Sequence, residues 1–455
     1  MHRTRTSHAR FSHDSIASLG YDWSRIGGDE GPGRYPRAIY LPETTADVAA
    51  AVQESVLLQR PLRIRGKGHS SNDLVVSDRG ALLCTERLSA IGRLDGEAGT
   101  VTVQAGVTVG ALEEHLAARG FGLPVAPDHP DISVGGYASA GGLGPASHRF
   151  GLFADTVAAA EYVDWSGRVT RVSRSDDPTA LRRLLGGVGR HGVITELTCD
   201  VIAIDKGATV LRNDRRVTRQ FAAFAAMCTR FAADPEDARY ARGVWLDAGE
   251  RKPRVGQLSI YRDAPDGRRA RARNAVSYGA LHRVGRLCSA LPPGPAAAVK
   301  AAGSLAGMIG SPRYASVRNI ELFTDAVIDH TVGDPARTLV AVAPVETLEA
   351  AFHAIYERCV ELRERERCVT FISIHFKGIR SAYLAGGSEP RRYGELMLIL
   401  GVDPARMTDP LLDGLVADVD RLCVEHEAFR LLHTRTGSDP RVDPNSRYAG
   451  VPQPA

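Results

Sequence analysis

The sequence predicts an α+β fold made of two unlike parts. Up to about residue 205, short strand-like segments alternate with helical segments, and two glycine-rich loops interrupt them at residues 65–73 and 128–151. Beyond residue 206 the pattern changes to a long helical run, further strands and an arginine-rich stretch. A chain of 455 residues with 44% hydrophobic residues is long enough for two to three domains.

The first part opens with a strand, a proline-bounded turn and a helix within residues 35–57. The run ETTADVAAAV places a threonine cap ahead of helically spaced apolar residues. A second helix, residues 108–120, has apolar residues at helical spacing and ends at a glycine. Strands are predicted at residues 61–66, 82–85, 100–106 and 192–204 and as a pair within 156–173, with a further helix at 179–187.

The second part starts with a predicted helix at residues 215–235 and two predicted strands at 244–249 and 254–262. A strand and a long helix share residues 336–365, strands follow at 368–378 and 395–404, and a last helix lies near 409–428. This change of pattern places a domain boundary near residue 206.

Composition argues against several classes of protein. A net charge of +4 is small for this length, so nucleic acid is not expected as a partner. The seven cysteines are widely spaced and form no CxxC pair, which predicts buried reduced thiols and no metal site. The basic N-terminus lacks the apolar segment of a signal peptide, and prolines and Lys300 interrupt the weakly polar stretch 287–312. We therefore expect a cytoplasmic protein without a membrane span.

The common nucleotide-binding patterns are absent, but two glycine-rich loops remain. No GxxxxGK[ST] motif occurs, and GGVGRHG, residues 186–192, precedes a predicted strand where a dinucleotide-binding Rossmann motif would open a helix. Glycines let backbone N–H groups converge on an anion, so the loops at 65–73 and 128–151 together suit a pyrophosphate. Two tight turns are the alternative interpretation.

Five segments, taken in order, resemble the FAD-binding domain of the vanillyl-alcohol-oxidase-type flavoproteins, also called the PCMH type. They are RYPRAIYLPETTADVAAAV, RGKGHSSND, VTVQAGVTVGALEEHL, SVGGYASAGGLG and GGVGRHGVITELT, within residues 33–205. The second loop is most similar to cytokinin dehydrogenases, and the HSSND ending of the first is similar to alditol and aldonolactone oxidases. The resemblance implies an FAD-binding domain of two α/β subdomains at 33–205. An extension at 1–32, a substrate domain with an antiparallel sheet and flanking helices at 206–430, and a returning tail at 431–455 complete the expected organisation.

The resemblance also gives His69 a role. In the family, the histidine at this position bonds covalently to the flavin 8α-carbon. Some relatives add a thioether from a cysteine at the position of His129, and no cysteine occurs between Cys84 and Cys199. We therefore expect FAD with a single covalent link through His69. An ordinary loop histidine is the alternative.

Further cofactor contacts are implied by position in the two loops and in one strand. They are Gly66, Lys67, Gly68, Ser70, Asp128, Ser133, Gly135, Gly136, Ser139, Gly142, Leu143 and Val193. Gly141 and Gly106 are expected to serve close backbone approach, although a plain turn explains Gly106 equally well.

Asp128 is the first candidate for a catalytic group. It matches the cytokinin dehydrogenase aspartate that accepts a proton from the substrate amine, so the resemblance implies a general base near the flavin. An Asx turn before Pro130 or a structural contact to the flavin site are the alternatives. Asp131 is a weaker candidate.

The second domain offers His375 and Lys377, which lie two residues apart and therefore on one face of a predicted strand. The segment SVRNIELF, expected as another strand, offers Arg318 and Glu321. A solvated strand face is the alternative for both pairs. The tail contributes a further set of candidates: His433, Arg435 and Tyr448.

These observations predict an FAD-dependent oxidase or dehydrogenase that takes hydride from a CH–OH carbon of a hydroxylated small molecule. Oxidation of a CH–NH group in the cytokinin dehydrogenase manner is the runner-up, and a flavin-binding protein without catalysis is the alternative of another class. The expected partners are a small-molecule substrate and molecular oxygen or another electron acceptor.

Overall fold

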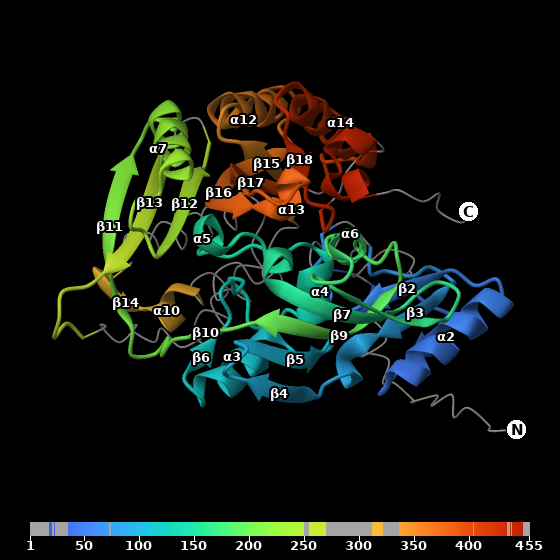
Figure 1. Ribbon diagram of the computed structural model, residues 1–455. Coiled ribbons are helices and arrows are strands. Elements are labelled where there is room, and N and C mark those ends of the chain that lie inside the picture. Colours follow the sequence, from blue (N-terminus) through green and yellow to red (C-terminus); the bar gives the residue numbers. More distant parts are fainter. Residues whose placement is uncertain are drawn as a thin grey trace, which may run out of the picture.

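The computed structural model describes residues 18–20, 22, 35–71, 74–249, 254–269, 312–321, 336–403, 405–434, 437 and 439–448. Arg435, the loop residues Asn72 and Asp73, and residues 287–311 of the weakly polar stretch lie outside the described residues. Figure 1 shows two bodies that face each other, the N-terminal body below and a large sheet with its helices above.

Three parallel strands and one helix open the N-terminal body. These elements are β1 (Ala38–Tyr40), α2 (Thr45–Leu57), β2 (Leu62–Arg65) and β3 (Ala81–Cys84), and the strands pair in the order β1-β3-β2. Helix α2 begins at a capping box, in which the Asp47 N–H donates to the Thr44 hydroxyl and the Thr44 N–H donates to the Asp47 carboxylate. Val48 and Val52 of α2 share a buried apolar cluster with Leu83 of β3, which fixes the helix on this sheet.

An antiparallel sheet of five strands, in the order β4-β5-β9-β7-β8, forms the centre of this body. Its strands are β4 (Ile91–Asp95), β5 (Thr100–Gln104), β7 (Val157–Val163), β8 (Val169–Ser173) and β9 (Val193–Asp200). The intervening elements are α3 (Val109–Ala117), β6 (Phe121–Gly122), α4 (Val134–Ser139), α5 (Ser147–Phe150) and α6 (Pro178–Leu184), and β6 pairs with β10 (Ile202–Ala203). Leu112 of α3, Val134 of α4 and Leu197 of β9 belong to one apolar cluster, so the second glycine-rich loop is anchored to this sheet.

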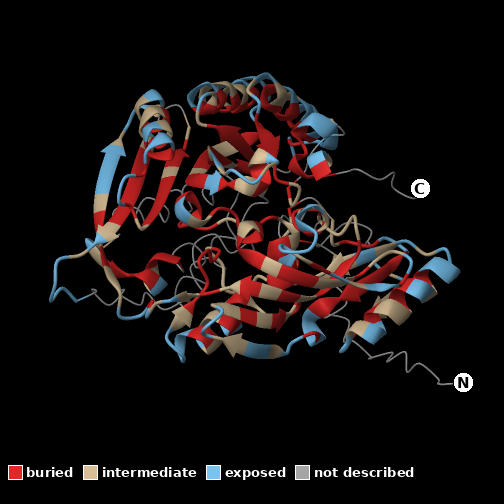
Figure 2. Ribbon diagram, in the orientation of Figure 1, coloured by how far each residue is buried: buried red, intermediate tan, exposed pale blue. Residues whose placement is uncertain are grey.

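The upper body is an antiparallel sheet of eight strands, in the order β14-β11-β13-β12-β16-β17-β15-β18. Its strands are β11 (Val210–Thr218), β12 (Tyr240–Asp247), β13 (Arg254–Asp263), β14 (Tyr314–Ser316), β15 (Ala336–Pro344), β16 (Val369–Ser381), β17 (Arg391–Val402) and β18 (Phe429–Arg430). Helices α7 (Phe221–Ala233), α12 (Leu348–Glu366) and α14 (Asp409–Glu425) cover one face, and the largest buried cluster lies between them and the sheet (Figure 2). The predicted antiparallel sheet with flanking helices is thus confirmed.

Two local predictions for the upper body are wrong. Residues 215–218, predicted as the start of a helix, end strand β11, because they pair with residues 256–259 of β13. The segment SVRNIELF, predicted as a strand, divides into β14 and the short helix α10 (Val317–Glu321). Strand pairing stops at Ser316 because its partner, Val210, is the first residue of β11.

The described residues include six of the seven cysteines. The six cysteines among them are reduced and buried. No group of three candidate ligand side chains able to hold a metal ion occurs in the described ranges. Within the same ranges, no helix has both the length and the apolar character needed to cross a bilayer.

A buried ion cluster joins the two bodies at Lys206. Its Nζ lies 2.9 Å from Glu113 Oε1 on α3 and 2.9 Å from Glu321 Oε2 on α10, and it donates to the Leu123 carbonyl at 3.0 Å. A Cβ at Gly122 would lie 2.5 Å from Lys206 Cε, so glycine makes room for the lysine stem. Burial raises the pKa of Glu321 to about 7 against the opposing charge of Lys206.

This raised pKa predicts a specific pH dependence of stability. The folded protein binds the Glu321 proton more tightly than the unfolded chain, so this contribution is fully present below about pH 4 and is lost as pH rises through about 7. Thermal unfolding of Glu321→Gln between about pH 5 and pH 8 should therefore show a smaller loss of midpoint temperature than the wild type. Glu114→Gln, on the exposed side of α3, is the matched control and should follow the wild type; equal slopes in all three proteins would contradict the prediction.

Candidate functional site

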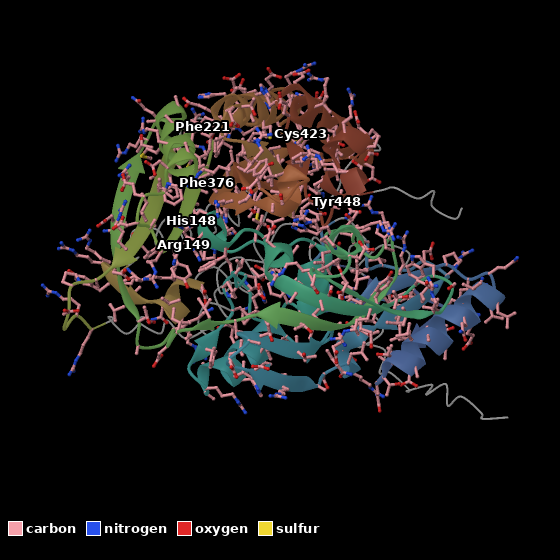
Figure 3. All side chains as sticks on the ribbon, in the orientation of Figure 1. His148, Arg149, Phe221, Phe376, Cys423 and Tyr448 are labelled. Carbon is pink, nitrogen blue, oxygen red and sulfur yellow. The ribbon has the colours of Figure 1, made fainter. Side chains whose placement is uncertain are left out.

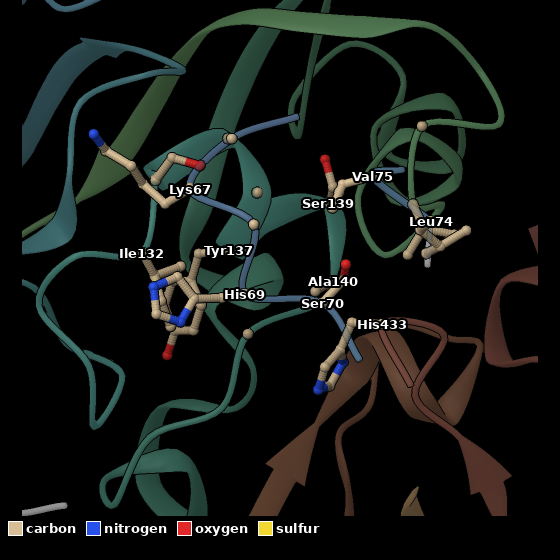
Figure 4. A pocket seen from close by; sticks show the side chains of 18 of the residues that line it. Lys67, His69, Ser70, Leu74, Val75, Ile132, Tyr137, Ser139, Ala140 and His433 are labelled. Atoms are coloured by element: carbon tan, nitrogen blue, oxygen red, sulfur yellow. The ribbon is translucent and has the colours of Figure 1, made fainter. Parts of the chain in front are cut away.

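A cavity of about 580 Å³ lies where both glycine-rich loops face the eight-stranded sheet. Its volume is in the range of small-molecule and cofactor sites, roughly 300–1,000 Å³. Figure 4 shows Lys67, His69 and Ser70 on one loop and His433 arriving from the C-terminal segment. Most of the predicted cofactor residues line this cavity: Gly66, Lys67, Gly68, His69, Ser70, Asp128, Ser133, Gly135, Gly136, Ser139, Gly142 and Leu143.

The first loop follows β2 and has glycine where side chains would interfere. At Gly66 a Cβ would lie 2.1 Å from Ser133 Oγ, so the two glycine-rich loops pack directly on each other. Gly68 has a φ of +77°, in the left-handed region, and a Cβ there would meet Arg65 Nη2 at 2.4 Å. These two positions set the backbone that presents His69.

His69 is a neutral imidazole in this environment. Burial, the neighbouring His129 and the charge of Arg65 lower its pKa to about 3. The ring centroids of His69 and His129 lie 4.2 Å apart, and the Asp131 N–H donates to His129 Nδ1 at 3.2 Å. A neutral ring keeps one nitrogen lone pair, which a bond from nitrogen to carbon requires.

The second loop packs tightly on the central sheet. Its helix α4 begins after Ser133, and the Gly135 N–H donates to the Ala105 carbonyl at 2.8 Å. A Cβ at Gly135 would lie 2.6 Å from Ala105 Cβ, a contact that the adjacent backbone could not relieve easily. The loop therefore approaches the end of β5 closely only because this residue is glycine.

Asp128 belongs to a cluster of four charged side chains. Arg242 Nη2 on β12 lies 2.7 Å from Asp128 Oδ1, Lys377 Nζ on β16 lies 3.1 Å from Oδ2, and the same Nζ is 3.5 Å from Glu395 Oε2 on β17. Burial raises the pKa of Asp128, but the charges of Arg242 and Lys377 outweigh it and hold the pKa below its usual range. Burial also raises the pKa of Glu395. Asp128 is therefore ionised and already paired at neutral pH.

Side chains of the upper sheet form the wall opposite the loops. His375 and Lys377 of β16 stand beside Met397 and Glu395 of β17, their paired residues, and His433 follows β18. Burial and the charge of Lys377 lower the pKa values of His375 and His433 to about 4 each. Two neutral imidazoles thus share the cavity with one paired lysine.

Other predicted residues lie outside the cavity lining. Val193 is fully buried against α2, although its neighbours Gly192 and Ile194 line the cavity. A Cβ at Gly106 would lie 1.8 Å from the Thr85 carbonyl oxygen, which indicates a structural turn. The other predicted residues that lie outside the cavity lining are Asp131, Gly141, Arg318, Glu321 and Tyr448.

Tyr448 has a structural partner of its own. Tyr448, labelled in Figure 3, donates its hydroxyl to the Tyr383 carbonyl at 2.5 Å, and Tyr383 belongs to the short helix α13 (Ala382–Ala385) between β16 and β17.

Sequence reasoning missed part of the sheet side of the site. Thr338 of β15 and Glu395 and Met397 of β17 line the cavity, and Arg242 of β12 pairs with Asp128. Only sheet pairing brings these three strands together. The alternation within ELMLIL places Glu395 and Met397 on one face, which is the one local signal that points to them.

Part of this chain is similar in sequence to known proteins. Residues 36–173 match the family described as an FAD binding domain. The chain is 32% identical over 168 residues to an uncharacterized oxidoreductase of the fasciation locus of Rhodococcoides fascians, covering 37% of this chain and 38% of that protein. It is 29% identical over 181 residues to the L-gulono-1,4-lactone dehydrogenase of Mycobacterium tuberculosis, covering 40% of each. The matched segment thus spans about two fifths of these relatives.

A solved structure extends the likeness in fold to nearly the whole chain. The 6-hydroxy-D-nicotine oxidase of Arthrobacter nicotinovorans superposes with a TM-score of 0.64 at 17% identity, covering 96% of this chain and 91% of that chain. Together, the family match and this superposition confirm the predicted PCMH-type architecture.

A substitution in the first loop tests whether its backbone conformation is needed to bind FAD. Gly68→Ala places a side chain on a residue with left-handed backbone angles, which costs roughly 1–2 kcal/mol of stability. The new Cβ also collides with the Arg65 side chain, near His69. Gly120→Ala is a matched control, because Gly120 has the same φ of +77° with nothing within 4 Å. Purified Gly68→Ala should carry clearly less FAD per protein by absorbance than Gly120→Ala. Equal flavin content would show that the loop tolerates the change.

Proposed function

We propose that this chain, whose residues 36–173 are an FAD binding domain, is a flavin-dependent oxidoreductase that takes hydride from a CH–OH carbon of a hydroxylated small molecule. The carrying observation is a single cavity with His69 on the loop side and His375, Lys377 and His433 on the sheet side. In this proposal the substrate lies between a loop-bound flavin and the polar side chains of the sheet.

The loop side fits FAD attached through His69. The neutral imidazole supplies a lone pair, and Gly66, Gly68 and Gly135 let the loop backbones approach closely where a Cβ would collide. When bound, the flavin supplies the hydride acceptor, while the protein positions the substrate and manages its proton.

The charges of the cavity favour an alcohol over an amine. The acidic residues that line it are Asp128 and Glu395, and Lys377 lies between them. Asp128 is already paired with two cations and Glu395 lies 3.5 Å from Lys377, and burying a further cation beside Lys377 is costly. A hydroxyl group avoids that cost and can hydrogen-bond to a neutral imidazole.

Proton removal from the hydroxyl is assigned to a histidine. With pKa values of about 4, His375 and His433 are both unprotonated near neutral pH and can accept a proton. Asp128, with its lowered pKa and two cationic partners, is a poorer base and is assigned to holding Lys377 in place. In this proposal Lys377 stabilises negative charge that develops on the substrate oxygen.

Covalent attachment gives the first test. The purified wild type should stay yellow after acid precipitation, and the denatured chain should carry one added FAD mass. His69→Ala should bind FAD only reversibly, because the attacking nitrogen is gone. His129→Ala is the control: it removes the ring next to His69 but keeps the His69 nucleophile. Quantitative release of FAD from the wild type would rule out attachment.

Anaerobic bleaching of the flavin tests the proton acceptor. Polyols, lactones and amines are first screened for peroxide release and for bleaching, and bleaching by none of them in a flavin-loaded protein would favour a non-catalytic flavin carrier. With an active substrate, His375→Gln or His433→Gln should slow reduction by roughly 10²–10⁴-fold at one of the two positions.

The Asp128 variant separates base from positioning residue. Asp128→Asn should slow reduction less than the more damaging histidine change, and Asp131→Asn, nearby and exposed, should leave it unchanged. Because all the candidate bases have lowered pKa values, the wild-type rate should show no rising limb between about pH 6 and pH 8. The largest loss at Asp128 would reassign the base to that carboxylate.

A further inference from the structure

Segments from both ends of the chain hold the first glycine-rich loop next to His69. The Ser70 hydroxyl donates to Asp22 Oδ2 at 3.1 Å, across 48 residues of sequence. The Ser71 N–H donates to the His433 carbonyl at 2.9 Å, and Ser71 forms an isolated parallel bridge with Thr434. The two residues that directly follow His69 are therefore tied to distant parts of the chain.

Asp22 is an unusual residue for this place. It is only 2% exposed, and burying a carboxylate is costly unless it accepts hydrogen bonds. Its partner Ser70 lines the cavity together with Lys67 and His69. A hydrogen bond to a carboxylate oxygen is of the stronger kind when the carboxylate is ionised.

On the other side of His69 the backbone is constrained as well. Gly68 takes a φ of +77°, and Arg65 occupies the space where a side chain at Gly68 would stand. Because Gly68 is constrained, the orientation of the loop backbone at His69 depends on the contacts that hold Ser70 and Ser71. Of these two ties, the one at Ser70 is made by a side chain that substitution can remove.

We propose that Asp22 is a positioning residue for flavin attachment: through its hydrogen bond with Ser70 it aims the His69 imidazole at the reacting carbon. This inference rests on the proposed attachment of FAD through His69. Orientation is the remaining requirement, because the ring is already neutral and needs no further activation by loss of charge.

The attachment balances with molecular oxygen as the oxidant. A C–N bond between His69 and the 8α-carbon replaces one C–H bond of the flavin methyl group and the N–H bond of the imidazole. Two protons and two electrons are released, and the electrons pass through the flavin to oxygen, which becomes hydrogen peroxide. Asp22 takes no part in these bond changes. It affects only the fraction of time during which the His69 ring points at the 8α-carbon.

The experiment measures attachment separately from binding. Flavin-free protein is prepared by expression under riboflavin limitation and mixed with FAD, and the fraction carrying the FAD mass is followed in time on denatured samples. Reversible binding before attachment is measured by quenching of flavin fluorescence. The proteins are the wild type, Asp22→Ala, Ser70→Ala, the double variant, and Asp78→Ala as a control at an exposed aspartate.

Asp22→Ala should attach FAD roughly 10- to 100-fold more slowly, the loss expected for one hydrogen bond to a charged acceptor. Reversible affinity should change far less, and Asp78→Ala should match the wild type. Ser70→Ala should be slow as well, and the double variant should be no slower than the slower single one, because both changes remove the same contact.

Three outcomes would overturn the inference while leaving attachment through His69 in place. They are attachment by Asp22→Ala at the wild-type rate, full additivity of the two losses, and a loss of reversible binding as large as the loss of attachment. If Asp22→Ala does not fold, an unchanged rate in Ser70→Ala has the same consequence. A wild type that releases all of its FAD would instead remove the proposed attachment and this inference together.

Discussion

The pairing of Asp128 with Arg242 and Lys377 is the contact on which the rest of the cavity depends. Asp128 comes from a loop of the N-terminal body, whereas Arg242 and Lys377 come from strands of the upper sheet. Breaking a buried ion pair by removing one partner typically costs about 3–5 kcal/mol, because the other charge stays buried and uncompensated. The cluster therefore fixes how the sheet wall stands over the loops, and any substrate must fit the space it defines.

The same environment explains why three of the four histidines that line the cavity, His69, His375 and His433, are neutral. Burial is the largest cause of the lowered pKa at His69, His375 and His433, and nearby arginine and lysine side chains add to it. Neutral imidazoles suit two different tasks, a nucleophile toward carbon on the loop side and proton acceptors on the sheet side. One electrostatic arrangement thus supports both the proposed cofactor link and the proposed chemistry.

Local patterns predicted well the elements whose cause is local. The capping box of the helix Thr45–Leu57 is formed by residues within four consecutive positions. In the strand Val369–Ser381, His375 and Lys377 lie on one face because side chains alternate along a strand. The prediction failed where a neighbour decides the outcome. Residues 215–218 extend because β13 pairs with them, and the strand at Tyr314–Ser316 ends because β11 offers no further partner. Helix α4 escaped notice because its glycines read as a loop.

By itself the sequence determined the α+β class, the two glycine-rich loops and the presence of a histidine between glycine and serine in the first of them, because these are properties of neighbouring residues. Only the tertiary structure decided that Asp128 is paired with Arg242 and Lys377, that Val193 faces the core, and that Asp22 and His433 meet the His69 loop. Charge pairing, burial and long-range hydrogen bonds depend on which strands lie side by side. The order of the strands in the sheet is set by the packing of the whole chain and cannot be read from the residue at any single position.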